Sequence, residues 1–296
     1  MTADRGTSDA VAPTSLVITP AAEAALVARL RAAGCVFAEE EAALLIDAAR
    51  TTDELEHMAA RRVDGNPLEG IIGWADFAGL RIAVDPDVFV PRRRSEVLVN
   101  EAVRLLTDAA PAGSPSTPSR AIPLVVDLCC GTGAIGMGIA ARVPAIELLA
   151  ADVDPVEVAC ARRNIEPAGG TVLLGDLYEA LPDAARGRVD ILVVNAPYVP
   201  TESIALMPPE ARLHEPVVAL DGGFDGLDIQ RRVAAAASEW LVPGGHLLIE
   251  TSVRQAPVTG AILTDAGLTT RVVHDDELDG TVVIGRAGTG TVARER

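Results

Sequence analysis

Short apolar runs alternate with stretches of helical spacing over the second half of the chain. The runs have the length and β-branched content of strands, and they predict strands over 124–128, 147–151, 171–174, 189–194 and 246–250. Such an alternation is typical of a parallel sheet with helices on both faces. Two further runs, 269–273 and 281–286, have only a short connection, which favours an antiparallel pair. The pattern therefore predicts an α/β fold with a doubly wound, mostly parallel sheet and an antiparallel last strand.

The first part of the chain has a different pattern. Apolar residues at helical spacing predict three short helices, which begin after Thr19-Pro20, at residue 39 (over 39–50) and after a capping box at Thr51. After residue 65, apolar residues recur at every second position, which predicts a β-hairpin. Ser95 is expected to cap the following helix, 96–106. The predicted organisation is a disordered tail over 1–15, a small helical domain over 16–64, a linking β-hairpin over 65–94, the sheet domain over 95–287 and a tail over 288–296.

The strand predicted over 189–194 ends at the polar, proline-stiffened turn Asn195-Ala196-Pro197-Tyr198. Ligands of open α/β sheets bind outside the carboxyl ends of the strands, so the Asn195 side chain is expected to face a pocket. The plain structural alternative is a turn with a capping asparagine.

The first strand of the sheet joins its helix through a glycine loop with Gly131, Gly133 and Gly136. Glycine lets the backbone approach a ligand and lets the helix pack closely on the strand. Asp152 closes the second strand, where a carboxylate can accept hydrogen bonds from ribose hydroxyls. Asp176 follows the third strand and is placed to meet an adenine edge. The loop therefore predicts a nucleotide-shaped ligand.

Two such ligands fit the loop, a nicotinamide dinucleotide and S-adenosylmethionine. Asp127, at the mouth of the first strand, would repel a pyrophosphate at the helix N-terminus. The same carboxylate attracts the ammonium and sulfonium groups of S-adenosylmethionine. The structural alternative is that Asp127 caps amides of the loop.

Composition narrows the function further. The net charge is −17 and all 25 basic residues are arginine, which excludes chemistry that needs a lysine and argues against a broad nucleic-acid-binding surface. The four cysteines, Cys35, Cys129, Cys130 and Cys160, have no metal-ligand spacing, so reduced thiols and a cytoplasmic setting are expected. The first 15 residues have no apolar segment of a signal peptide, and no run of 18 apolar residues predicts a membrane span.

Taken in order, these motifs resemble the release-factor glutamine methyltransferases of the HemK type. The resemblance covers nearly the whole chain and includes Val90-Pro91-Arg92 and the segments 151–155, 175–178, 215–228 and 243–255. It implies an enzyme that uses S-adenosylmethionine to methylate the side-chain amide nitrogen of a glutamine in a protein. The implied acceptor is the Gly-Gly-Gln motif of a translation release factor, and the implied role of the helical domain is to recognise this substrate.

Two motifs depart from the usual pattern of that family. Its tetrad is commonly Asn-Pro-Pro-Tyr, in which the asparagine oxygen and the carbonyl of the second residue accept hydrogen bonds from the substrate amide, and the tyrosine packs against the substrate. Ala196 supplies the same carbonyl, and Pro197 confines it to extended conformations, so activity is expected to survive. The segment 91–96 reads Pro-Arg-Arg-Arg-Ser-Glu where Pro-Arg-Pro-(Glu/Asp)-Thr-Glu is common, which reverses the local charge. These departures suggest a side branch with its own protein substrate.

The resulting hypotheses name individual residues and no metal ligand. The expected catalytic residues are Asn195, Ala196, Pro197 and Tyr198. The expected cofactor-binding residues are Asp127, Cys129, Gly131, Gly133, Gly136, Asp152, Val153, Asp176, Leu177 and Asn195. The expected substrate-binding residues are Pro91, Arg92, Asn195, Pro197 and Tyr198, and Glu250 is expected to support the pocket floor. The alternatives are an amino methyltransferase of nucleic-acid bases, a noncatalytic cofactor-binding protein and a nicotinamide oxidoreductase.

Overall fold

The structure is a computed structural model that describes residues 16–108 and 122–289. It divides into two compact units, residues 1–72 and residues 73–296. The predicted tail over 1–15, most of the predicted tail over 288–296 and most of the loop between 107 and 121 lie outside the described residues. Within the described part, no helix is both long enough and apolar enough to cross a membrane.

The first unit is helical. Its helices are α1 (Pro20–Ala32), α2 (Ala38–Ala48), α3 (Thr52–Val63) and α4 (Leu68–Ile72). The Thr51 hydroxyl accepts a hydrogen bond from the Glu54 amide (3.1 Å), which confirms Thr51 as the N-cap of α3. The Glu54 carboxylate accepts a hydrogen bond from the Arg50 amide, one residue before the amide that a capping box uses. The helix α4 replaces the predicted start of the hairpin, because Ile71 is buried among the apolar side chains of the other three helices.

The hairpin begins in the second unit and is shorter than predicted. Its strands β1 (Trp74–Phe77) and β2 (Leu80–Ala83) pair antiparallel. Ala78 and Gly79, which form the turn, both have positive φ (52° and 79°), as a two-residue hairpin turn of type I′ requires. Asn164 holds the hairpin against the glycine loop, because its side-chain amide bonds both backbone groups of Ala83 and the carbonyl of Thr132.

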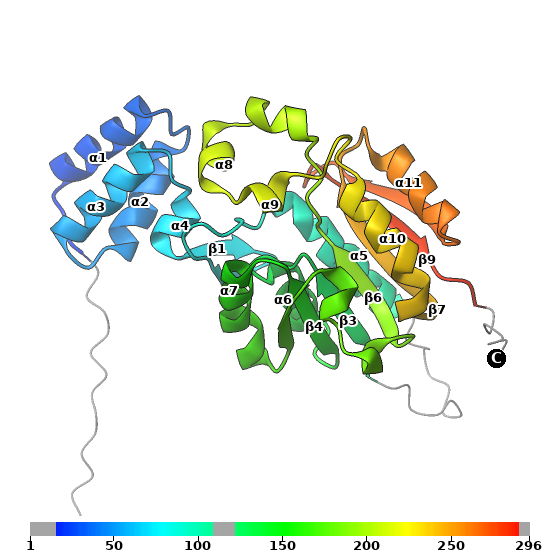
Figure 1. Cartoon of the computed structure of the whole chain (residues 1–296). Helices are drawn as coiled ribbons and strands as arrows, with labels where there is room; N and C mark the ends of the chain where they lie inside the picture. The colour runs from blue at the N-terminus through cyan, green and yellow to red at the C-terminus, as the bar shows by residue number, and fades with distance from the viewer. Residues whose placement is uncertain (1–15, 109–121, 290–296) are drawn as a thin grey trace, which may run out of the picture. The chain divides into compact units, whose positions relative to one another are not determined.

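The sheet of the second unit has seven strands in the order β5-β4-β3-β6-β7-β9-β8 (Figure 1). Its members are β3 (Leu124–Leu128), β4 (Glu147–Asp152), β5 (Thr171–Leu174), β6 (Val189–Val194), β7 (Leu241–Thr251), β8 (Thr269–Asp275) and β9 (Gly280–Arg286). The strand β9 pairs antiparallel with both β7 and β8, and the other pairs are parallel. The predicted fold class is therefore confirmed. The chain moves from β3 to β5 on one side and from β6 to β9 on the other, so the strand order reverses between β3 and β6.

Helices cover both faces of this sheet (Figure 1). One face packs on α5 (Glu96–Asp108), α6 (Ala134–Arg142) and α7 (Pro155–Ile165), and the other on α10 (Asp228–Trp240) and α11 (Ala256–Asp265). Alternate strand residues supply the two cores: Val125 and Val193 face the first group of helices, and Val126 and Leu192 face the second.

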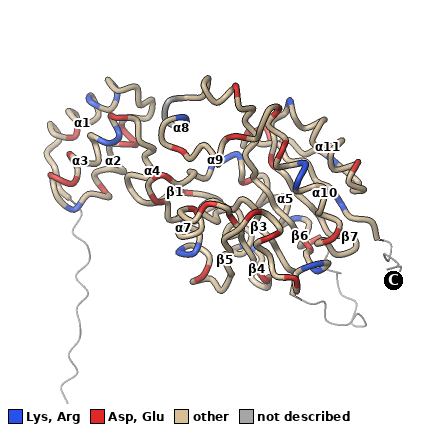
Figure 2. The backbone as a smooth tube through the Cα atoms, viewed as in Figure 1, with Lys and Arg blue, Asp and Glu red and all other residues tan. Residues whose placement is uncertain are grey.

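Short helical turns fill the connections. They are η1 (Arg93–Ser95), η2 (Glu166–Ala168), η3 (Leu177–Ala180), η4 (Asp183–Ala185), η5 (Thr201–Leu206), α8 (Pro209–His214) and α9 (Val217–Leu220). Acidic and basic positions are interspersed over the described residues (Figure 2).

Gly133 allows a test of the packing that places the glycine loop. It has a φ of +76°, and an added Cβ would lie 2.5 Å from Cδ1 of Ile165 on α7. Gly169 has a similar φ of +87° but open space around it, so Gly169→Ala is a matched control. We expect Gly169→Ala to lower the free energy of unfolding by about 1–2 kcal/mol. Gly133→Ala should lower the free energy of unfolding, measured with urea, by about 1–3 kcal/mol more than Gly169→Ala does. Equal decreases in the two variants would contradict the packing argument.

Candidate active site

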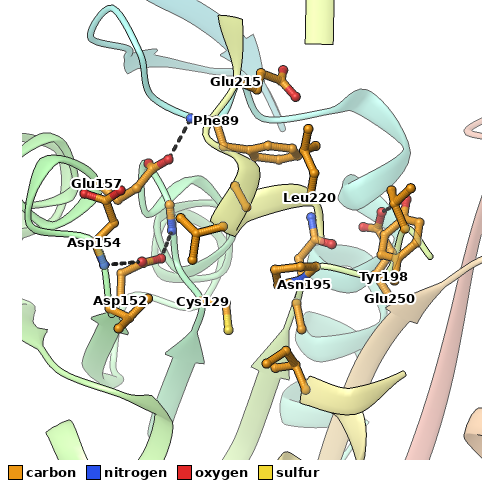
Figure 3. A pocket seen from close by; sticks show the side chains of 18 of the residues that line it. Phe89, Cys129, Asp152, Asp154, Glu157, Asn195, Tyr198, Glu215, Leu220 and Glu250 are labelled. Carbon is orange, nitrogen blue, oxygen red and sulfur yellow. Dashed lines mark hydrogen bonds between the residues drawn. The ribbon is translucent and has the colours of Figure 1, made fainter. Parts of the chain in front are cut away.

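A cavity of about 300 Å³ lies at the carboxyl ends of the central strands (Figure 3). The predicted site residues that line it are Arg92, Cys129, Gly131, Asp152, Val153, Asp176, Leu177, Asn195, Ala196, Pro197 and Tyr198. These residues come from distant parts of the chain, and the parallel pairing of β3, β4, β5 and β6 brings them together.

Four predicted site residues do not line the cavity. Pro91 precedes the lining residue Arg92 in the chain but does not itself line the cavity. Gly133 is covered by Ile165, and Gly136 by Leu148 and Asp127. Of the three glycines of the loop, Gly131 alone lines the cavity. Gly133 allows α7 to pack closely on the loop, and Gly136 allows α6 to pack closely on β3 and β4.

Asp127 is the fourth of these residues, and its side chain is fully buried. Its Oδ2 accepts a hydrogen bond from the Gly136 amide (2.8 Å) in the first turn of α6, while no described residue bonds its Oδ1. Burial raises the pKa of this carboxyl to about 8, more than the Gly136 amide lowers it. The structure thus favours the capping role over direct contact with a ligand.

Asp152 joins the end of β4 to the glycine loop. Its Oδ2 accepts from the Gly131 amide (2.9 Å) and its Oδ1 accepts from the Asp154 amide (3.0 Å), as the dashed lines in Figure 3 show. Burial raises the pKa of this carboxyl, against the effect of these hydrogen bonds. The two bonds fix the carboxylate at the cavity wall.

Asp176, after β5, is held by Arg232 from α10. The Arg232 Nη2 lies 2.6 Å from the Asp176 Oδ2, and both residues line the cavity. The hydrogen bond that Arg232 donates to Asp176 raises the pKa of the Arg232 guanidinium. Sequence reasoning missed Arg232, because the arginine lies on an amphipathic helix 56 residues away and no local motif marks it.

Asn195 takes part in a chain of polar contacts that fixes its amide. Its Nδ2 donates to the Ser95 hydroxyl (3.2 Å). The Ser95 hydroxyl in turn acts on the pKa of the Glu250 carboxyl, at the end of β7, and lowers it. The Glu250 Oε1 also accepts from the Tyr198 hydroxyl and from the Arg94 Nε, each at 3.4 Å. The nitrogen of the Asn195 amide is thus held by Ser95, in a residue that lines the cavity.

Burial dominates the electrostatics of this group. It raises the pKa of Glu250, and it raises the pKa of Tyr198 to about 12, so the tyrosine is a neutral hydrogen-bond donor. Glu250 is 2% exposed, which agrees with the support role expected for it. Ser95 differs from its prediction: it ends the turn η1 (Arg93–Ser95), and its side chain contacts Asn195 and Glu250.

Two arginines after the hairpin line the cavity. Arg92 forms an ion pair with the buried Glu215, and its guanidinium lies over the Phe89 ring, 5.3 Å from the centroid. Arg94 pairs with Glu250, while its side chain stays 47% exposed. Two of the three consecutive arginines thus pair with acids, and they bring positive charge to the cavity.

The residues present fit S-adenosylmethionine. Within 4 Å of a Cβ added at Gly131 lies one side-chain atom, the Glu157 Oε2 at 3.6 Å, so the backbone is open to a ligand there. Asp152, Asp154 and Glu157 form an acidic wall beside it (Figure 3). Such a wall suits a cationic ligand and opposes a pyrophosphate.

Comparison with known proteins identifies the family. The model of the Methyltransferase small domain family matches residues 101–208. A release factor glutamine methyltransferase of Geobacter sulfurreducens is 37% identical over 212 residues, which are 71% of this chain and 69% of the relative. The chain belongs to the release factor glutamine methyltransferase family. This methyltransferase is thus an enzyme that uses S-adenosylmethionine, as predicted.

Two further matches bear on fold and substrate. A 4-amino-L-phenylalanine/4-methylamino-L-phenylalanine methyltransferase of Streptomyces pristinaespiralis is 34% identical over 211 residues, 71% of this chain and 70% of the relative. A methyltransferase from Pyrococcus furiosus shares the fold, with a TM-score of 0.50 and 16% identity over 71% of this chain and 90% of that one.

The contact between Ser95 and Asn195 predicts a positioning role for the serine in this methyltransferase. Ser95→Ala removes the hydroxyl that orients the Asn195 amide, so kcat should fall about tenfold, the effect of one lost hydrogen bond. Ser95→Thr keeps the hydroxyl and should restore most of the rate. The Kd of S-adenosylmethionine should stay within about twofold in both variants. An equal loss in both variants, or a loss confined to KM, would contradict the positioning role.

The raised pKa of Asp127 predicts a pH dependence of stability. An unfolded aspartate has a pKa of about 4, so between about pH 4 and 8 folding takes up a proton at Asp127. The free energy of unfolding then falls as pH rises, by up to about 1.4 kcal/mol per pH unit from this group. Asp127→Asn does not titrate and retains an acceptor for the Gly136 amide. The Tm of the variant should therefore fall less than that of the wild type between pH 5 and pH 7.5. Equal decreases in Tm would refute the raised pKa assigned to Asp127.

Proposed function

We propose that this methyltransferase transfers the methyl group of S-adenosylmethionine to the side-chain amide nitrogen of a glutamine in a protein, with a translation release factor as the substrate. The observation that carries the proposal is the Asn195 amide, held by Ser95 beside the backbone of Ala196 in the cavity. The names of the relatives from Geobacter sulfurreducens and Bordetella pertussis support the same acceptor.

The reaction needs fixed hydrogen-bond acceptors more than it needs a base. An amide nitrogen is a poor nucleophile, because its lone pair is delocalised into the carbonyl. The Asn195 Oδ1 and the Ala196 carbonyl, whose direction Pro197 restricts, would hold the two N–H groups and aim the lone pair at the methyl carbon. They would also stabilise the positive charge that develops on nitrogen.

The bonds made and broken balance without a further reactant. The cofactor supplies a methyl group on a positively charged sulfur. The amide nitrogen forms the new bond to carbon, the carbon–sulfur bond breaks with its electron pair going to sulfur, and a proton leaves the nitrogen for solvent. Glu250 is not required as a base, because the positive charge that forms on the amide nitrogen makes its N–H acidic enough to lose the proton to water.

The remaining site residues would hold the cofactor. Asp152 would accept hydrogen bonds from the ribose, Gly131 and Cys129 would contact the methionine part, and Val153, Asp176 and Leu177 would surround the adenine. Arg232 would keep the Asp176 carboxylate in place. Asp127, Gly133 and Gly136 would act indirectly, by fixing the glycine loop.

Recognition of the protein substrate falls to the helical unit in this proposal. The turn between α1 and α2 exposes two large apolar side chains, Val36 (82%) and Phe37 (66%). Such exposed apolar groups suit a protein partner.

A second candidate acceptor is the amine of a small amino acid. The Streptomyces pristinaespiralis relative carries the name of such an enzyme, and it matches as much of this chain as the Geobacter sulfurreducens relative does. Arg94 favours this candidate, because its half-exposed guanidinium at the cavity could pair with a substrate carboxylate.

One assay separates the two candidates. The protein is incubated with isotopically labelled S-adenosylmethionine and either a release factor with a Gly-Gly-Gln motif or 4-amino-L-phenylalanine. Peptide mass spectrometry should find the label on the glutamine of that motif, and a release factor with alanine at this glutamine should take up none. Label on 4-amino-L-phenylalanine alone would replace the protein substrate with the small one.

Asn195→Ala tests the mechanism in the same assay. Loss of one preorganised hydrogen-bonding group should reduce the transfer rate at least about a hundredfold. The Kd of S-adenosylmethionine should remain nearly unchanged, because all but one of the expected cofactor-binding residues are other than Asn195. A comparable loss of cofactor affinity would remove the role assigned to Asn195.

A further inference from the structure

Glu157 is a buried acid of the cavity that the mechanism does not use. It lies in the first turn of α7 and is 3% exposed. Its Oε1 accepts a hydrogen bond from the Phe89 amide (2.7 Å), which ties α7 to the segment after the hairpin (Figure 3). Its Oε2 is buried, and no described residue gives it a hydrogen bond. One oxygen of this carboxyl is therefore held by the protein, and the other is left for a ligand.

The unpaired oxygen faces the glycine loop. It lies 3.6 Å from the position that a Cβ of Gly131 would take. The neighbouring acids are already engaged: Asp152 bonds the amides of Gly131 and Asp154, and Asp154 bonds the Val156 amide. On this wall of the cavity, Glu157 thus offers the acceptor that the described protein groups leave unsatisfied.

An unpaired buried carboxyl oxygen is costly. Asp127 Oδ1 and Glu250 Oε2 are also unpaired among the described residues, but Asp127 does not line the cavity, and Glu250 lies on the side of Asn195. Glu157 is therefore the acid beside the glycine loop that a donor from a ligand can reach.

Burial raises the pKa of Glu157 to about 8, more than the Phe89 amide lowers it, and the charges of Asp152, Asp154 and Glu215 raise it further. A cation bound beside the carboxylate would relieve both the missing hydrogen bond and the crowding of negative charge.

S-adenosylmethionine has two cationic groups. The sulfonium must lie near Asn195, where the methyl group is transferred, and Figure 3 shows Asn195 across the cavity from Glu157. The ribose hydroxyls have Asp152 as their acceptor. The group that remains is the α-ammonium of the methionine part. We propose that the Glu157 Oε2 binds the α-ammonium group of S-adenosylmethionine, opposite Gly131.

A binding cycle on the full chain tests this contact. Isothermal titration calorimetry measures the Kd of S-adenosylhomocysteine, which carries the ammonium, and of its analogue that lacks the α-amino group. For the wild type, loss of the amino group should weaken binding about tenfold to a hundredfold, as expected for a charged hydrogen bond. Glu157→Gln retains an acceptor for the Phe89 amide but has no charge. This variant should raise the Kd of S-adenosylhomocysteine by a similar factor. The Kd of the analogue should stay within about twofold of its wild-type value.

Asp154→Asn is the matched control, because it removes one charge from the same wall and keeps an acceptor for the Val156 amide. It should change the Kd of the two ligands by equal factors. Two outcomes would overturn the proposal. If Glu157→Gln raises the Kd of both ligands by the same factor, Glu157 contacts another part of the cofactor. If the variant changes neither Kd, the role of Glu157 is structural. If the variant does not fold, the wild type alone decides, since equal Kd values for the two ligands exclude an ammonium contact. The measurement needs no methyl acceptor, so its outcome is independent of the proposed substrate.

Discussion

The parallel pairing of β3 with β6 is the constraint on which the site depends. It places Leu128 beside Val194, so that the glycine loop and Asn195 leave the sheet at neighbouring points. At the same point the strand order reverses, and the helices that follow the two strands lie on opposite faces of the sheet. The space between the loops that leave the sheet there is where open α/β sheets bind ligands, and the cavity lies there.

Polar side chains then connect the strand ends into one rigid edge. Asp152 ties the end of β4 to the glycine loop, and the contacts among Glu250, Ser95 and Asn195 tie the end of β7 to the end of β6 through the start of α5. These contacts lie in buried surroundings, where hydrogen bonds are stronger and an unpaired polar group is costly. The edge is therefore preorganised before any ligand arrives, as fixed acceptors require if they are to stabilise a transition state.

The elements and motifs predicted correctly are those that depend on short stretches of sequence. The strand β6 and its polar end at Asn195, or Asp152 at the end of β4, can be recognised within a few residues. Ser95 could not be assigned in this way, because a serine before a helix satisfies the ordinary pattern of an N-cap, and its true partner Asn195 lies 100 residues further along the chain. Arg94 pairs with a residue 156 positions away, and Glu157 bonds a backbone amide 68 positions away. For Asp127 the local sequence is misleading. A carboxylate beside a glycine loop suggests a ligand contact, but this side chain is fully buried and bonds the Gly136 amide in the first turn of α6.

The departures from the family pattern divide by the kind of group they change. Ala196 replaces a proline at a position whose expected contribution is a backbone carbonyl, so the substitution leaves that acceptor in the chain, and Pro197 still restricts its direction. Ser95 stands where a threonine is common and keeps the hydroxyl that Asn195 and Glu250 use. Arg94 is different, because it replaces an acid with a base on the cavity wall and pairs with Glu250. The groups proposed to orient the methyl acceptor are thus retained, while the charge of one side chain on the cavity wall is reversed. Under the proposed mechanism, such a change acts on the choice of substrate and leaves the methyl transfer itself unaltered.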